Sequence, residues 1–91
     1  MTQPPPVLSD ETRLLLLRLA DKLDALRPNA AMAEGIRLAQ ALVLAEQLHG
    51  VTEAAYSAEQ DLLAAMPLVR EDETRGEYAT QLRLIAQGVA L

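Results

Sequence analysis

The stretch that decides the fold is residues 38–69, LAQALVLAEQLHGVTEAAYSAEQDLLAAMPLV. It contains no Lys or Arg, while four acidic residues lie among its leucines and alanines: Glu46, Glu53, Glu59 and Asp61. Leu and Ala have high helix propensities, so the stretch predicts acidic and strongly apolar helices. Such helices favour binding to protein surfaces and argue against the partners that a basic helix would seek.

The composition of the whole chain predicts one small all-α domain. Ninety-one residues suffice for a single core, and 18 Leu and 16 Ala outnumber five Val and two Ile, which favour strands. Hydrophobic residues make up 51% of the chain, but its only aromatic residues are two tyrosines. Apolar surface is therefore left over after folding. We predict a small helical bundle of three to four helices that is completed by homodimerisation.

Charge and missing residue types exclude several classes of function. A net charge of −5 disfavours nucleic acid and anionic lipid as partners. The chain has no Cys, one His and no Gly-rich loop after a strand, so we expect no enzyme activity and no cofactor. No apolar run approaches the roughly 18 residues of a membrane span, and no signal peptide is evident. We expect a cytoplasmic protein.

The first helix is expected after a Pro-rich leader. Residues 1–8 predict a disordered leader, and residues 9–91 predict a single helical domain. Ser9 is a suitable N-cap, and Pro28 predicts that the helix ends near Arg27.

A second helix is expected from about Ala30, with Asn29 as its cap. Its apolar face is predicted to consist of Met32, Ile36, Ala39, Leu42 and Val43. Its narrow polar side is predicted to consist of Glu34, Arg37, Gln40 and Gln47. Because apolar residues surround most of this helix, we predict that it is the most buried one.

Gly50 leaves two architectures open. If a helix ends there and Thr52 caps the next one, the chain forms a four-helix up-and-down bundle. The apolar spacing of four and three also continues through Gly50, which favours one long central helix from about Ala30 to Met66. Such a helix would be about 55 Å long and would require a second subunit to cover it.

The last helix is marked by a capping box. Pro67 ends whichever helix precedes it, and Thr74 with Glu77 has the T-x-x-E spacing of a helix start. The buried face of this helix is predicted to consist of Tyr78, Leu82, Ile85 and Val89, with the helix fraying or ending near Gly88.

Glu46 and His49 form an E-x-x-H pair, which is the local unit of dinuclear carboxylate sites in helix bundles. Half-length ferritin-like proteins complete such sites by dimerising, so a di-metal protein is an alternative function by analogy. The site needs more carboxylates from other helices. An exposed Glu beside a helix-end His explains the pair more simply, so no bound metal is predicted.

Residues 44–63, LAEQLHGVTEAAYSAEQDLL, resemble the helix-turn-helix pattern of bacterial regulators, with Gly50 at the turn. The resemblance implies a DNA-reading helix after Gly50. The spacing from Ala45 to Gly50 is five where the pattern has four, and the implied recognition helix is acidic. Phosphate would repel it, so a divergent DNA-binding protein is a second alternative and no nucleic acid partner is expected.

The function that we predict is that of a small acidic interaction module. An adaptor, assembly factor, chaperone-like subunit or inhibitor needs excess apolar helix surface and no reactive group. Its partner is another protein, a second copy of the chain, or both. The predicted contact residues are Leu14, Leu17, Gly35, Leu44 and Leu48.

Overall fold

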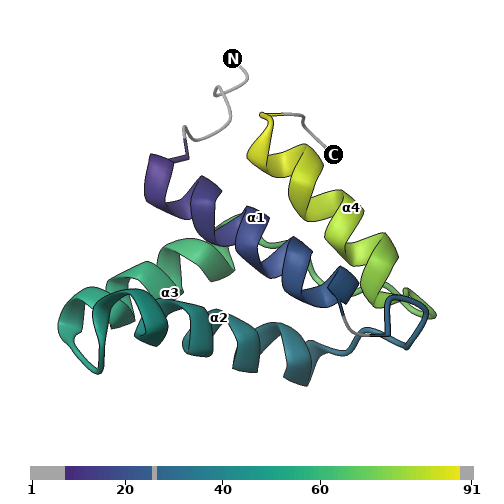
Figure 1. Cartoon of the computed structure of the whole chain (residues 1–91), viewed down its shortest axis with the longest axis horizontal. Helices are drawn as coiled ribbons and strands as arrows, with labels where there is room; N and C mark the ends of the chain where they lie inside the picture. Colours follow the sequence, from purple (N-terminus) through teal and green to yellow (C-terminus); the bar gives the residue numbers. More distant parts are fainter. Residues whose placement is uncertain (1–7, 26, 89–91) are drawn as a thin grey trace, which may run out of the picture.

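The computed structural model describes residues 8–25 and 27–88, and these ranges contain four helices (Figure 1). They are α1 (Asp10–Ala25), α2 (Glu34–His49), α3 (Glu53–Ala65) and α4 (Arg75–Ala86). The predicted small all-α bundle is confirmed. The predicted leader lies outside the described residues except for Leu8, which is half-buried against the core. Val89 also lies outside them.

Three helix starts follow the predicted capping residues. The Ser9 hydroxyl accepts a hydrogen bond from the Thr12 amide at 3.1 Å, and the Thr52 hydroxyl accepts one from the Ala55 amide at 3.2 Å. Thr74 and Glu77 form the predicted reciprocal capping box at the start of α4. These bonds satisfy amides that have no partner within their own helix.

The predicted start of the second helix is wrong. The helix begins at Glu34, four residues later than expected, and its N-cap Ala33 makes no side-chain hydrogen bond. The preceding backbone instead pairs with the segment before α4: the Met32 amide donates to the Glu73 carbonyl at 2.8 Å, and the Arg75 amide donates to the Ala30 carbonyl at 2.9 Å. These long-range bonds hold residues 30–32 out of a helix.

Gly50 breaks the central helix. Its φ of +71° lies in the left-handed region that favours glycine, and its amide donates to the Glu46 carbonyl at 2.7 Å. The chain turns there, and α3 returns beside α2 (Figure 1). The predicted helix break at Gly50 and the count of four helices in the described ranges are therefore confirmed, and the continuous helix is wrong. The up-and-down order is not what the structure shows, because α3 does not pack along α4 as it would in such a bundle.

The helices form two pairs that pack into a thin molecule. α1 packs mainly on α4, and α2 packs mainly on α3, within extents of 39 × 32 × 18 Å. The largest fully buried side chains in the described ranges come from α1, α3 and α4: Leu15, Leu16, Leu19, Leu62, Tyr78 and Leu82. The core therefore lies mainly between α1, α3 and α4, with α2 at its margin.

None of the helices in the described ranges combines the length and the apolar character that crossing a bilayer requires.

Candidate interaction surface

Arg37 determines which side of α2 faces the interior. Its side chain is directed inward, and the residue is only 9% exposed. Nη2 donates to the carbonyl oxygens of Leu63 and Met66, at 3.0 and 3.3 Å. Carbonyl groups at the end of a helix have no intrahelical donor, so Arg37 caps the end of α3. Nη1 also donates to Glu34 Oε1 at 2.6 Å.

The segment after α3 is held by a second set of buried polar groups. The Tyr78 hydroxyl donates to the Pro67 carbonyl at 2.6 Å, and the Tyr78 side chain is completely buried. Burial raises the pKa of Tyr78 to about 12, although the charge of Arg37 acts in the opposite direction. Buried Glu73 accepts hydrogen bonds from the Arg70 amide and from the Gln81 side chain. Together with Arg37, these contacts fix the path from α3 to α4.

The opposite side of α2 is apolar and faces solvent. We define the outer face of α2 as Gly35, Leu38, Ala39, Leu42, Val43 and Glu46, which share one side of the helix by their spacing. Leu38, Leu42 and Val43 are 48%, 44% and 37% exposed. Glu46 is the one charged member. A helix that is apolar on nearly all sides is normally buried, but none of the other helices in residues 8–25 and 27–88 covers this face of α2.

The predicted orientation of α2 is therefore reversed. Arg37 was expected on the solvent side and is buried, whereas Leu42 and Val43 were expected in the core and are exposed. The side that α2 buries is rich in alanine, as is the buried side of α3: Ala41, Ala45, Ala55 and Ala58. Leu44 and Leu62 are buried on these sides as well, whereas Leu38 and Leu42 are exposed on the opposite side of α2.

The predicted contact residues have different positions in the structure. Gly35 lies on the outer face of α2. Leu14 and Leu17 are exposed on α1, and Leu48 is exposed near the end of α2. Leu44 was predicted as a contact residue, and this prediction is wrong for the monomer surface. It is 5% exposed and belongs to the hydrophobic core, because it lies on the same side of α2 as Arg37.

Leu38, Leu42 and Val43 were not predicted to be exposed, although all three lie at the surface. The spacing of small residues does not distinguish the two sides of α2, because Ala41 and Ala45 lie on the buried side whereas Gly35 and Ala39 have the same spacing on the exposed side.

Gly35 has no packing role within the monomer. Apart from the adjacent residues and the nearby backbone of α2 itself, no heavy atom of the described residues lies within 4 Å of the position that a Cβ would occupy there, and the residue needs no positive φ. Glycine within a helix is about 1 kcal/mol less favourable than alanine. The contacts of the described residues therefore do not explain why residue 35 is glycine.

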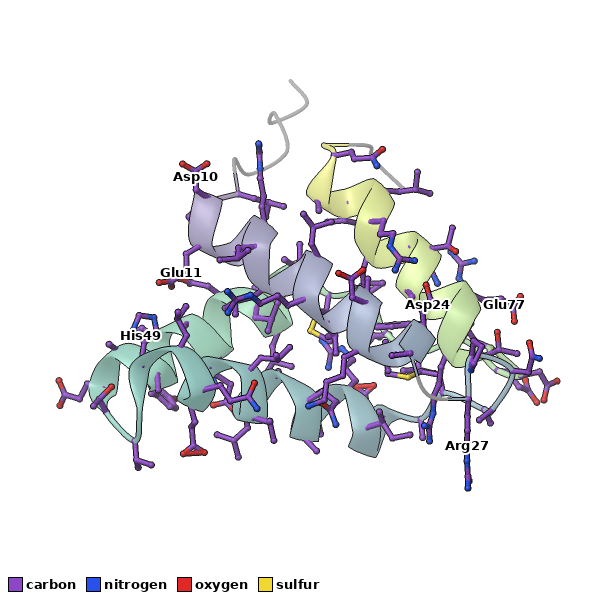
Figure 2. All side chains as sticks on the ribbon, viewed as in Figure 1. Asp10, Glu11, Asp24, Arg27, His49 and Glu77 are labelled. Carbon is purple, nitrogen blue, oxygen red and sulfur yellow. The ribbon has the colours of Figure 1, made fainter. Side chains whose placement is uncertain are left out.

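The predicted metal candidates do not come together as a metal site. Figure 2 shows His49 and Glu11 directed toward one another, and their Nε2 and Oε1 atoms are 2.9 Å apart. This pair joins the end of α2 to the start of α1, while Glu46 lies on the outer face of α2. Across residues 8–25 and 27–88, no three His, Asp or Glu side chains are grouped so that they could hold a metal ion.

Ion pairs between α1 and α4 stabilise the other half of the molecule. Arg83 Nη2 lies 3.0 Å from Asp21 Oδ1, and Nη1 pairs with Asp24. The hydrogen bonds to Asp24 and then to Asp21 raise the pKa of Arg83 above its ordinary value. Half-exposed pairs of this kind contribute about 1 kcal/mol or less. They connect the two helices at the surface.

Comparison of the chain with protein-family models, curated proteins and solved structures finds no significant match.

Proposed function

We propose that this chain is a protein-interaction module and that its contact surface is the outer face of α2. The observation that carries the proposal is the exposure of Leu38, Leu42 and Val43 on a helix whose arginine is buried. Contiguous exposed apolar side chains on a small domain are typical of interaction sites. Covering them with another protein removes apolar surface from water, which is favourable.

The mode of binding that we propose is helix packing. The outer face has the spacing with which an amphipathic helix contacts another helix or a groove. An adaptor, assembly factor, chaperone-like subunit or inhibitor works in this way and requires no reactive group. The acidic residues of α3 support a protein partner over a nucleic acid, because they repel phosphate: Glu53, Glu59 and Asp61.

Site-specific photo-crosslinking in the native host cell tests this proposal. A photoreactive amino acid replaces Leu42 on the outer face, and the matched control carries it at Thr80, which is exposed on α4. We expect covalent adducts of defined mass from position 42 and few or none from position 80, because only the first position lies in the proposed contact. Equal labelling at the two positions, or no adduct at position 42, would contradict the proposal.

A further inference from the structure

We infer that the protein bound by the outer face is a second copy of this chain, with the two α2 helices antiparallel about a two-fold axis. This inference rests on the proposed function and adds the identity of the partner. Three features of the outer face favour a second copy as the partner: the order of its side chains, its charge, and Gly35.

The outer face is self-complementary in volume. Its positions 35, 38, 39, 42, 43 and 46 have the same spacing in both directions, so a two-fold axis between residues 40 and 41 superimposes the pattern on itself. Leu42 then lies opposite the partner's Ala39, which pairs a large side chain with a small one. Leu38 lies beside its own copy along one flank, and Val43 lies beside its own copy along the other.

The face is also self-complementary in charge. In the same register, Glu46 lies opposite the partner's Gly35, in the first turn of the partner's α2. Ala33 gives that helix start no side-chain hydrogen bond. A carboxylate is favourable beside the amides and positive dipole at a helix N-terminus. The acidic residue already in that turn, Glu34, is paired with Arg37 at 2.6 Å. A parallel pair would instead place Glu46 against its own copy, where the two charges repel each other.

The antiparallel arrangement explains why residue 35 is glycine. A Cβ at this position would meet no other side chain or segment among residues 8–25 and 27–88. In the antiparallel pair, the missing side chain lets the partner's Glu46 approach the backbone of the first turn. The contact is one helix face wide, which is small for a protein interface, so we expect a dimer that forms at micromolar or higher concentration.

The mass of the full chain in solution is the first test. Light scattering from micromolar to near-millimolar concentration is expected to approach twice the 9.9 kDa of one chain. Leu42→Glu is expected to halve that mass and keep its helical circular dichroism, because residue 42 is exposed near the axis. Leu17→Glu is the matched control: it changes a leucine of similar exposure on α1 and should remain dimeric.

A second outer-face variant distinguishes loss of the dimer from a folding defect caused by Leu42→Glu. Ala39→Gln places a good helix former at an exposed position and obstructs the partner's Leu42. We expect a folded monomer. If Ala39→Gln and Leu42→Glu both stay dimeric, or if Leu17→Glu dissociates, the inference is overturned.

Disulfide pairing tests the antiparallel register. The chain has no Cys, so Gly35→Cys and Glu46→Cys each carry one thiol. On mixing under mild oxidation, we expect the mixed disulfide to predominate. Two copies of position 35 would be about 16 Å apart along the helices, too far for a disulfide. Efficient pairing of Gly35→Cys with itself would overturn the antiparallel arrangement.

Failure of this inference can be distinguished from failure of the proposed function. A wild-type chain that stays monomeric up to near-millimolar concentration overturns the self-association. Photo-crosslinking from position 42 to a protein of different mass would then still support the interaction module. No adduct from position 42 would contradict that function as well.

Discussion

Tyr78 connects the core to the segment that follows α3. Its ring is completely buried, and its hydroxyl donates to the Pro67 carbonyl at 2.6 Å. Burial disfavours the phenolate, which raises the pKa from 10.0 to about 12. Deprotonation also removes the donor of this hydrogen bond. One side chain therefore makes the stability of the fold depend on pH at the alkaline end.

We expect the chain to lose stability between about pH 10 and pH 12. The folded pKa is higher than the unfolded one, so the stabilisation is complete below about pH 10 and is lost as the pH rises through about 12. The loss amounts to about 2–3 kcal/mol. In Tyr56→Phe, where Tyr78 is the sole tyrosine, tyrosinate absorbance should rise together with the loss of helical circular dichroism. Ionisation near pH 10 with the helices intact would contradict this prediction.

At the level of helices, the side of α2 that faces the core decides which of its residues are exposed. Arg37 holds one side of α2 against the end of α3 through the carbonyl groups of Leu63 and Met66. Ala41, Leu44 and Ala45 of α2 are buried with it. Leu38 and Leu42 lie on the opposite side of α2 and face solvent. The apolar outer face is therefore a consequence of how α2 and α3 pair.

Arg37→Met is expected to lower the free energy of unfolding by about 2–3 kcal/mol, because two carbonyls at the end of α3 lose a charged donor. Urea denaturation followed by circular dichroism measures the change. Arg13→Met is the control, since Arg13 is exposed on α1 and its replacement should change stability by about 0.5 kcal/mol or less. Equal effects of the two substitutions would show that the cap on α3 contributes nothing.

For the molecule as a whole, the short third dimension limits how much apolar surface is buried, and with it the free energy of unfolding. The shortest extent is 18 Å, and the largest fully buried side chains of the described ranges lie in three of the four helices. A domain of this size buries a smaller fraction of its surface than larger domains do. Covering the outer face of α2 with a second copy would add buried apolar area where the monomer has least.

Because a dimer dissociates when it unfolds, we expect the melting temperature of the wild-type chain to depend on protein concentration. For a folded dimer that unfolds to monomers, a tenfold increase in concentration should raise Tm by about 3–5 °C. Ala39→Gln should show no such dependence, because it obstructs the partner. Calorimetry over a hundredfold concentration range makes the comparison. A wild-type Tm that is the same at all concentrations would count against the dimer.

Local signals in the sequence were sufficient for the helical class and for several helix boundaries. Leu and Ala predominate among the apolar residues, and the capping residues Ser9, Thr52 and Thr74 mark three helix starts. These effects act between residues three or four positions apart, so the sequence by itself determines them. Gly35 was also predicted as a contact residue, and it lies on the proposed surface.

Long-range contacts decided the remaining features. The late start of α2 follows from backbone bonds between residues 30–32 and the segment before α4. The burial of Arg37 depends on carbonyl groups 26 and 29 residues away. Helix periodicity shows that α2 has different sides, but it does not show which side meets a neighbour. Only the packed structure settles that choice, because the partners of Arg37 come together only when α2 and α3 pair.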